Sequence, residues 1–299
     1  MRYGVRRGLA LTALLGMMFA VALTAIAQTT TGSTSIQEKI DNEAYGEAVG
    51  VPAGVHRVNL VIDRPLTLRG IRGAVLVPAD PSLPVITVTQ DQGVWIEIVE
   101  IRDARIGIEV TARDFVMTRC SVTASDIGVD ITSLPGTSEY QVISIDRCAF
   151  DGTGIGVLTT GSGTVGAFYC TFDGLGIGLA IRSADTAVIS SCIIRDCVLG
   201  ASFSVSKGAL VYASEIRDCL HSGIEVRFDP AAGTPATLAM SSNVIVDNRR
   251  WGLSFCGIDG AEHDASLATI FGTANRFSGN GWGPICPVEL ELPEIFFEP

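Results

Sequence analysis

Eight glycines recur within closely similar short phrases, and their spacing constrains the fold more than any other feature of the chain. Four of the seven intervals between them are 21 to 23 residues long, and the other three are 28 to 31 residues long. The glycines are Gly107, Gly128, Gly156, Gly178, Gly200, Gly223, Gly252 and Gly283. A unit that recurs at this period indicates a solenoid, in which each coil can bury its apolar face only against its neighbours.

Residues between the glycines alternate between apolar and polar, which is the pattern of strands. One column of the repeat is always apolar and includes Val122, Phe150 and Phe172. No helical period occurs in this region, and the turns are rich in Gly, Asp and Asn, which accept left-handed backbone angles. The sequence therefore predicts an all-β fold, a parallel β-helix of short stacked strands.

Cysteine and asparagine share two further columns of the repeat. The first is Cys120, Cys148, Cys170, Cys192, Ser214, Asn243 and Asn275, and the second is Cys197, Cys219, Asn248 and Asn280. Because free cysteine behaves as a small apolar residue, we expect buried thiol ladders here, and asparagine amides that link the coils. The remaining Cys256 and Cys286 should lie nearly opposite each other on the last two coils, and we predict one disulfide between them.

Residues 1–27 have the pattern of a secretory signal peptide. Three arginines precede an uncharged apolar run that ends in an A-x-A sequence. A retained membrane anchor is the alternative, since the run approaches the length of a spanning helix. We expect cleavage, a polar linker over residues 28–34, no membrane span in the mature protein, and a periplasmic, cell-surface or secreted location.

The chain is acidic, with a formal net charge of −11. It has no basic stripe, so nucleic acid is excluded as a partner. A polyanionic ligand would be repelled unless a divalent cation bridged the two. No cofactor is indicated by a motif, and Ca²⁺ is the one that the composition leaves open.

The ends of a solenoid must be covered. Ser35-Ile36-Gln37-Glu38 is a capping box that begins a short helix running to about Glu43, with Ile36 and Ile40 on one face. This helix should close the first coil of a β-helix over residues 35–286. The apolar segment 287–299 should fold back over the last coil.

Residues 35–70, SIQEKIDNEAYGEAVGVPAGVHRVNLVIDRPLTLRG, resemble the opening of secreted right-handed β-helix proteins of the pectate-lyase-like superfamily. Residues 275–283, NRFSGNGWG, are similar to the repeats of its periplasmic copper-processing and carbohydrate-binding members. The resemblance covers about residues 35–285 and implies a single-stranded right-handed parallel β-helix with an N-terminal capping helix. It does not imply one activity, because the superfamily includes lyases, hydrolases, esterases and non-catalytic proteins.

The motifs of characterised enzymes of that superfamily are missing from the sequence. The galacturonan hydrolases carry Asn-Thr-Asp, Asp-Asp and Gly-His-Gly, and the pectin methylesterases carry Gln-Asp-Thr-Leu and Asp-Phe-Ile-Phe-Gly. None of these occurs here. Three groups of residues remain as candidate sites.

The first group is a surface column of charged residues. It contains Asp151, Asp173, Arg195 and Arg217, and beside it stand Asp196, Asp218 and Asp247. Carboxylates stacked at the coil separation of about 4.8 Å can bind Ca²⁺, and an arginine above them could act as the base of a lyase. The alternative is a turn at which arginines offset aspartates.

The second group comes from the extra residues of the three long intervals, near residues 133–140, 229–236 and 257–265. These insertions all project from the same corner of the solenoid. The last two bring together Asp229, Asp259, Glu262, His263 and Asp264. A histidine with four carboxylates could hold a metal ion, and a solvated acidic loop is the alternative.

The third group is Trp251 and Trp282, which the glycine alignment places at equivalent positions of successive coils. Stacked surface tryptophans would form a platform for a sugar ring. Earlier coils have aliphatic residues at this position, so we favour packing in the core.

The sequence thus predicts an exported, monomeric, non-catalytic β-helix protein. We expect it to bind carbohydrate or another cell-envelope component, or to serve as a scaffold at the cell surface or in the periplasm. A polysaccharide lyase or glycoside hydrolase acting on an acidic polysaccharide, with Ca²⁺ dependence, is the alternative. Periplasmic metal handling is a third hypothesis.

Overall fold

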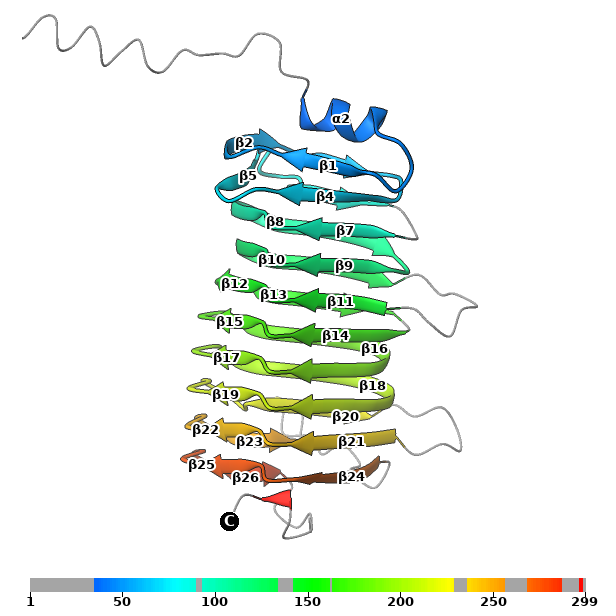
Figure 1. Ribbon diagram of the computed structural model, residues 1–299. Helices are drawn as coiled ribbons and strands as arrows, with labels where there is room; N and C mark the ends of the chain where they lie inside the picture. Colours follow the sequence, from blue (N-terminus) through cyan, green and yellow to red (C-terminus); the bar gives the residue numbers. More distant parts are fainter. Residues whose placement is uncertain are drawn as a thin grey trace, which may run out of the picture. The chain divides into compact units, whose positions relative to one another are not determined.

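The computed structural model describes residues 35–89, 93–133, 142–161, 163–228, 236–255, 268–286 and 296–297. The signal-peptide and linker predictions for residues 1–34 lie outside this part of the chain. In the unit that begins at Ile36, the described residues form the helix α2 (Ile36–Asn42), followed by 26 strands in a stack of coils (Figure 1). Among the described residues, no helix has the length and apolar character needed to span a membrane.

Each coil contributes strands to three faces of the stack. The first face is built by β1 (Ala48–Val51), β4 (Leu66–Gly70), β7 (Val94–Glu97), β9 (Phe115–Thr118), β11 (Val142–Asp146), β14 (Thr164–Phe168), β21 (Ala236–Ser241) and β24 (Ala268–Thr273). The second is built by β2 (Gly54–Val58), β5 (Ala74–Pro78), β12 (Ala149–Gly152), β15 (Thr171–Asp173), β17 (Ile193–Arg195), β19 (Glu215–Arg217), β22 (Val244–Val246) and β25 (Arg276–Ser278).

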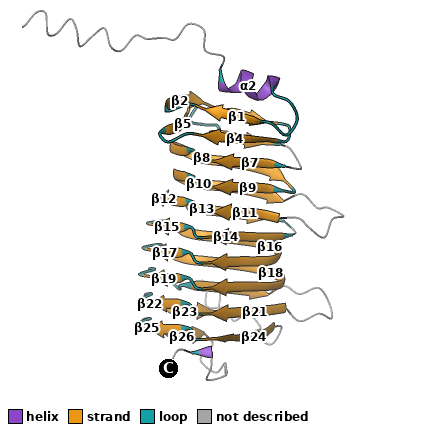
Figure 2. Ribbon diagram, viewed as in Figure 1, coloured by secondary structure: helices purple, strands orange, loops and turns teal. Residues whose placement is uncertain are grey.

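The third face is built by β3 (Leu60–Ile62), β6 (Ile86–Val88), β13 (Ile155–Thr160), β20 (Ile224–Phe228), β23 (Trp251–Ser254) and β26 (Gly283–Cys286). Four longer strands bend around corners and serve two faces: β8 (Glu100–Ala112), β10 (Ser121–Ser133), β16 (Ile177–Ser190) and β18 (Leu199–Tyr212). Figure 2 shows that strands dominate every coil. Neighbouring strands pair in parallel, which confirms the predicted parallel β-helix.

The predicted core columns are confirmed. Phe150 pairs in register with Phe172, which pairs with Ile194, and all three side chains are buried. The two phenylalanine rings stack with their centroids 5.0 Å apart. Six cysteines, those of the two ladders, are buried free thiols, and burial raises the pKa of Cys197 to about 11. The Cys197 thiol therefore stays protonated, and the six buried side chains fill the core as small apolar residues.

Hydrogen bonds along the ladders link one coil to the next. The Cys170 thiol donates to the Ile145 carbonyl oxygen at 3.4 Å. Further along the same ladder, Asn243 Nδ2 donates to Asn275 Oδ1 at 2.8 Å. In the second ladder, Asn248 Nδ2 donates to Asn280 Oδ1 at 2.9 Å. The expected amide links between coils are thus present, and they satisfy polar groups that would otherwise be buried without partners.

The repeating glycines are needed where neighbouring backbones approach closely. A Cβ atom at Gly178 would lie 2.6 Å from the Gly200 carbonyl oxygen, closer than any side chain can pack. The alignment of the last coil on Gly283 is wrong by one residue, because Trp251 pairs with Gly283 and Leu253 pairs with Ile285. The turn itself keeps its register, because Asn280 lies beside Asn248, and it is Gly283 that stands one residue earlier in its coil than Gly252.

The capping helix is confirmed at the first coil. Ile36 and Ile40 of α2 are buried. Gln37 supplies both halves of an amide pair to the exposed strand β3, since its Nε2 donates to the Val61 carbonyl at 3.0 Å and its Oε1 accepts from the Val61 N–H at 2.9 Å. The helix thus satisfies an edge that could otherwise pair with another chain. At the other end, the buried Phe296 ring lies 6.3 Å from Phe277.

Candidate functional site

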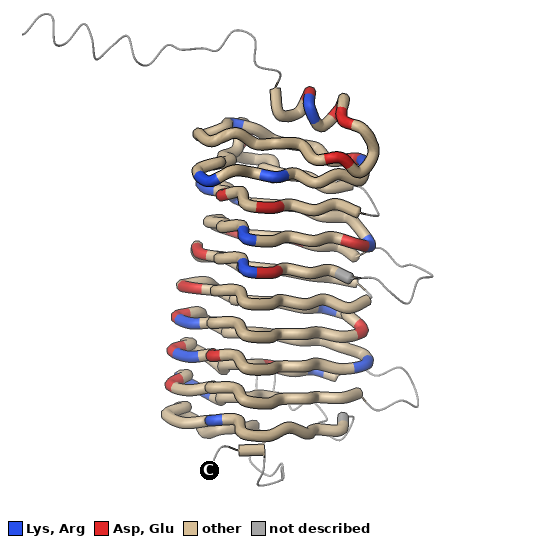
Figure 3. The backbone as a smooth tube through the Cα atoms, in the orientation of Figure 1, with Lys and Arg blue, Asp and Glu red and all other residues tan. Residues whose placement is uncertain are grey.

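The predicted charged column exists on the second face. Asp151 pairs in register with Asp173, Asp173 with Arg195, and Arg195 with Arg217. Figure 3 shows acidic and basic residues along the edge of the stack where β12, β15, β17 and β19 lie. The column therefore brings opposite charges together on successive coils.

Both arginines of this column are held in ion pairs. Arg195 Nε donates to Asp173 Oδ2 at 3.0 Å. Arg217 Nε donates to Glu215 Oε1 at 2.6 Å, and its Nη1 donates to Asp218. Hydrogen bonds to Asp218 and Glu215 raise the pKa of Arg217, which is the opposite of what a proton-abstracting base requires. These contacts agree with the alternative of a turn with offset charges.

The neighbouring aspartates occupy a strained backbone position. Asp196, Asp218 and Asp247 have φ angles of 55°, 57° and 56°. Gly174 and Gly279 stand at the corresponding turns with φ angles of 69° and 66°. Aspartate and glycine both tolerate the left-handed region, so the turn accounts for this choice of residues without a ligand.

The predicted metal group lies outside the described residues. This applies to Asp229, Asp259, Glu262, His263 and Asp264, so the metal hypothesis stays a prediction. Within the described ranges, no three His, Cys, Asp or Glu side chains are grouped to hold a metal ion. Cys286 is buried and disulfide-bonded, and its predicted partner Cys256 also lies outside the described residues.

The tryptophans do not form the packed pair that we favoured. Trp251 is half-buried, but Trp282 is 58% exposed, so the expectation of core packing is wrong for Trp282. Trp282 is equivalent to Arg250 and not to Trp251, so it lies in the turn before β26, outside the strand column. Its ring meets that of Trp251 edge to face, with centroids 6.1 Å apart.

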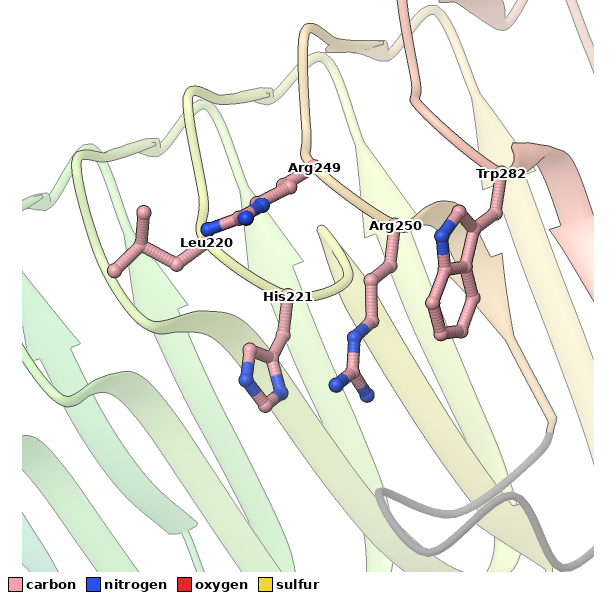
Figure 4. Close-up of a pocket in the computed structure, with 5 residues that line it drawn as sticks. All are labelled: Leu220, His221, Arg249, Arg250 and Trp282. Carbon is pink, nitrogen blue, oxygen red and sulfur yellow. The ribbon is translucent and has the colours of Figure 1, made fainter.

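Trp282 forms one side of a surface pocket of about 400 Å³ at the turns that lead into β20, β23 and β26. Its lining residues are Leu220, His221, Arg249, Arg250 and Trp282. Figure 4 shows that the side chains of His221, Arg250 and Trp282 extend to the same side from successive coils. We call this group of five residues the turn pocket.

Backbone hydrogen bonds set the order of side chains in the turn pocket. The Arg250 N–H donates to the His221 carbonyl at 3.1 Å, and the Trp282 N–H donates to the Arg250 carbonyl at 3.0 Å. The Arg250 guanidinium carbon lies 4.7 Å from the centroid of the Trp282 ring, in cation–π contact. The stack of coils thus fixes the imidazole, the guanidinium and the indole in one row.

The turn pocket carries positive charge on an acidic protein. Neither Arg249 nor Arg250 forms an ion pair within the described part of the chain, in contrast to Arg195 and Arg217. Burial, and then the charges of Arg250 and Arg249, lowers the pKa of His221. At neutral pH the imidazole is therefore uncharged and can donate or accept a hydrogen bond.

Sequence reasoning identified Trp282 and missed the other four residues of the turn pocket. One signal was present, because Arg249-Arg250 is the one pair of adjacent arginines beyond residue 27. A second signal was the ladder itself, because His221, Arg250 and Trp282 each stand two residues after one of its members, Cys219, Asn248 and Asn280. Alignment on the glycines concealed this equivalence.

Comparisons with known proteins address the fold. A family model described as the right handed beta helix region matches residues 84–287. Among solved structures, ORF18 of Geobacillus virus E2 is similar, with a TM-score of 0.61 and 12% sequence identity over 95% of this chain and 63% of the viral one. At this identity the likeness is one of fold alone. Among curated proteins, none matches the sequence significantly.

Proposed function

Because the chain belongs to the right-handed β-helix family, we propose that it is an exported, non-catalytic protein of the pectate-lyase-like kind that binds carbohydrate at the turn pocket. The observation that carries this proposal is the exposed ring of Trp282 beside Arg250 and His221. An indole ring offers a sugar an apolar surface, and the neighbouring polar groups can orient its hydroxyls.

The signal-peptide pattern of residues 1–27 supports export. The buried state of the six ladder thiols is compatible with an oxidising compartment, because inaccessible thiols do not exchange with disulfides. A carbohydrate at the cell envelope or outside the cell would then be the natural ligand class.

The lyase or hydrolase alternative has weaker support. Its candidate bases, Arg195 and Arg217, are engaged by carboxylates. Three of its candidate aspartates, Asp196, Asp218 and Asp247, occupy left-handed turn positions. The metal-handling hypothesis depends on residues outside the described part of the chain.

Binding to a panel of immobilised oligosaccharides tests the proposal, with protein that lacks residues 1–27. We expect Trp282→Ala to weaken binding of the responding glycan by about tenfold, as for loss of one stacked aromatic ring. Trp95→Ala is the matched control, because Trp95 is 50% exposed but stands on the first face, in β7.

Equal loss of binding in the two tryptophan variants, or no binding to any glycan, would contradict the proposal. Incubation of the same panel with Ca²⁺, followed by ultraviolet absorbance, detects the unsaturated products of a lyase. Formation of these products would show that the protein is a lyase and would contradict the proposed non-catalytic function.

A further inference from the structure

No carboxylate in the described part of the chain neutralises the positive charge of the turn pocket. Arg195 and Arg217 neutralise carboxylates of their own corner, whereas Arg249 and Arg250 have no ion-pair partner among the described residues. Arg250 is half-buried against the Trp282 ring, and Arg249 is exposed at the opposite side of the pocket. Two unneutralised guanidinium groups in one pocket favour an anion.

The nearby arginines, and not the net negative charge of the chain, determine whether the turn pocket attracts an anion. At physiological ionic strength, charges further apart than about 8 Å are largely screened. The carboxylate of Asp218, in the turn before His221, is already paired with Arg217. An anionic group inside the pocket therefore meets the two arginines at short range, while most of the acidic surface is screened from it.

Resting on the proposed function, we infer that the turn pocket binds a sugar that carries one anionic group, a carboxylate or a sulfate ester, directly through Arg249 and Arg250. A guanidinium group matches the paired oxygens of such an anion with two parallel hydrogen bonds. Trp282 then contacts the sugar ring, and His221 meets a hydroxyl. No divalent cation is needed as a bridge, because the protein supplies the positive charge itself. This revises the sequence-based expectation that an acidic glycan would require Ca²⁺.

The same argument favours short ligands over long polyanions. Beyond the pocket, each further anionic sugar would lie along a surface that includes Asp196 and Asp247, for which no ion pair exists among the described residues. Like charges within a screening length repel. A single acidic residue or a short oligosaccharide should therefore bind more tightly per site than a long polyuronide.

Calorimetry with a glucuronate-containing disaccharide, its uncharged methyl ester and a sulfated disaccharide tests the inference. We expect the two anionic sugars to bind at least about tenfold more tightly than the ester, as for loss of a charge-assisted hydrogen-bonded pair. Comparison of the two anions identifies which group the pocket prefers. Chelation with EDTA should leave the affinity unchanged.

Arg249→Gln should weaken binding of the preferred anion by about tenfold and leave binding of the ester unchanged. Arg250→Lys keeps the charge without the planar fork and should lose less affinity than Arg250→Gln. Arg276→Gln is the matched control, because Arg276 is exposed on β25 outside the pocket and the substitution removes the same net charge.

The outcomes separate the two proposals. If the ester binds as tightly as the acid and Trp282→Ala still weakens binding, the proposed function stands and this inference is wrong. Loss of affinity in EDTA, restored by Ca²⁺, would also overturn it. Absence of binding by any of the three sugars, together with a silent glycan panel, would remove the proposed function itself.

Discussion

Two charged regions lie at neighbouring turns of the same stack and differ in how their charges are used. In the column of Asp173, Arg195 and Arg217, carboxylates and guanidinium groups pair with each other. In the turn pocket, Arg249 and Arg250 stand beside an aromatic ring and an imidazole, and no carboxylate of the described ranges pairs with them. A charge that the protein itself neutralises stabilises a turn at most modestly, whereas a charge left unpaired in a pocket is available to a ligand.

Beneath the charged column, the buried asparagine ladder should contribute more to stability than the surface charges do. Asn248 is buried, its Oδ1 accepts from the Cys219 N–H at 3.1 Å, and its Nδ2 donates to Asn280 at 2.9 Å. Asn248→Ala should lower the free energy of unfolding by about 3 kcal/mol, because it leaves buried groups unsatisfied. Chemical denaturation measures this value.

Asp247→Gly is the control for that variant, because residue 247 has a φ of 56° that glycine adopts freely. A change below about 1 kcal/mol is expected. A large loss on replacing Asp247, with little effect of replacing Asn248, would show that the outer aspartates and not the inner amides hold the corner.

Replacing each pair of arginines by glutamine tests whether the charges of the turn pocket and of the column differ in their effect on ligand binding. The double variant Arg249→Gln/Arg250→Gln should weaken binding of the anionic disaccharide by about 50-fold, since two charged donors are lost. Arg195→Gln/Arg217→Gln removes the same charge from the paired column and should leave binding within about twofold. Equal losses in both doubles, read by calorimetry, would mean that net charge and not the pocket determines affinity.

The affinity of the turn pocket should depend on pH through His221. Its pKa is lowered in the free protein, mainly by burial, and a bound anion favours the imidazolium form. Affinity for the anionic disaccharide should therefore rise a few-fold as the pH falls from about 7.5 to about 5.5. His221→Gln should abolish this rise, and an unchanged slope in that variant would assign the effect to another group.

The sign is opposite for stability in the absence of ligand. A histidine whose pKa is lower in the folded state than in the unfolded state binds its proton more readily when unfolded. His221 should thus reduce stability as the pH falls below the unfolded value of about 6.5. Thermal unfolding of the wild type and of His221→Gln at several pH values measures this small term.

The smallest expected effect is that of a single ion pair of the column. Arg195 and Asp173 side chains are 40% and 35% exposed, so solvent screens their attraction. Arg195→Gln should lower the free energy of unfolding by less than about 1 kcal/mol. A loss of several kcal/mol in denaturant titrations would show that the column, and not the buried ladders, stabilises this corner.

Several features of the fold could be read from the sequence because a solenoid repeats its environment. Phe150 and Phe172, or Asn248 and Asn280, occupy equivalent positions of successive coils, so their spacing along the chain reports their contact in space. The helix at Ile36 was predictable because capping and one apolar face are local properties. The strand register and the buried ladders followed from the same periodicity.

The turn pocket was not predicted, because alignment on the glycines displaces the last coil by one residue and separates Trp282 from Arg250. In the structure Trp282 is equivalent to Arg250 and not to Trp251, so it lies in the turn and outside the apolar column. Hydrogen bonds between coils place it in one row with Arg250 and His221. Periodicity in the sequence determined which residues stack and face the core. The direction of side chains at irregular turns, and whether a charge finds a partner, were decided by the tertiary structure, because both depend on backbone angles and on neighbours that no fixed spacing encodes.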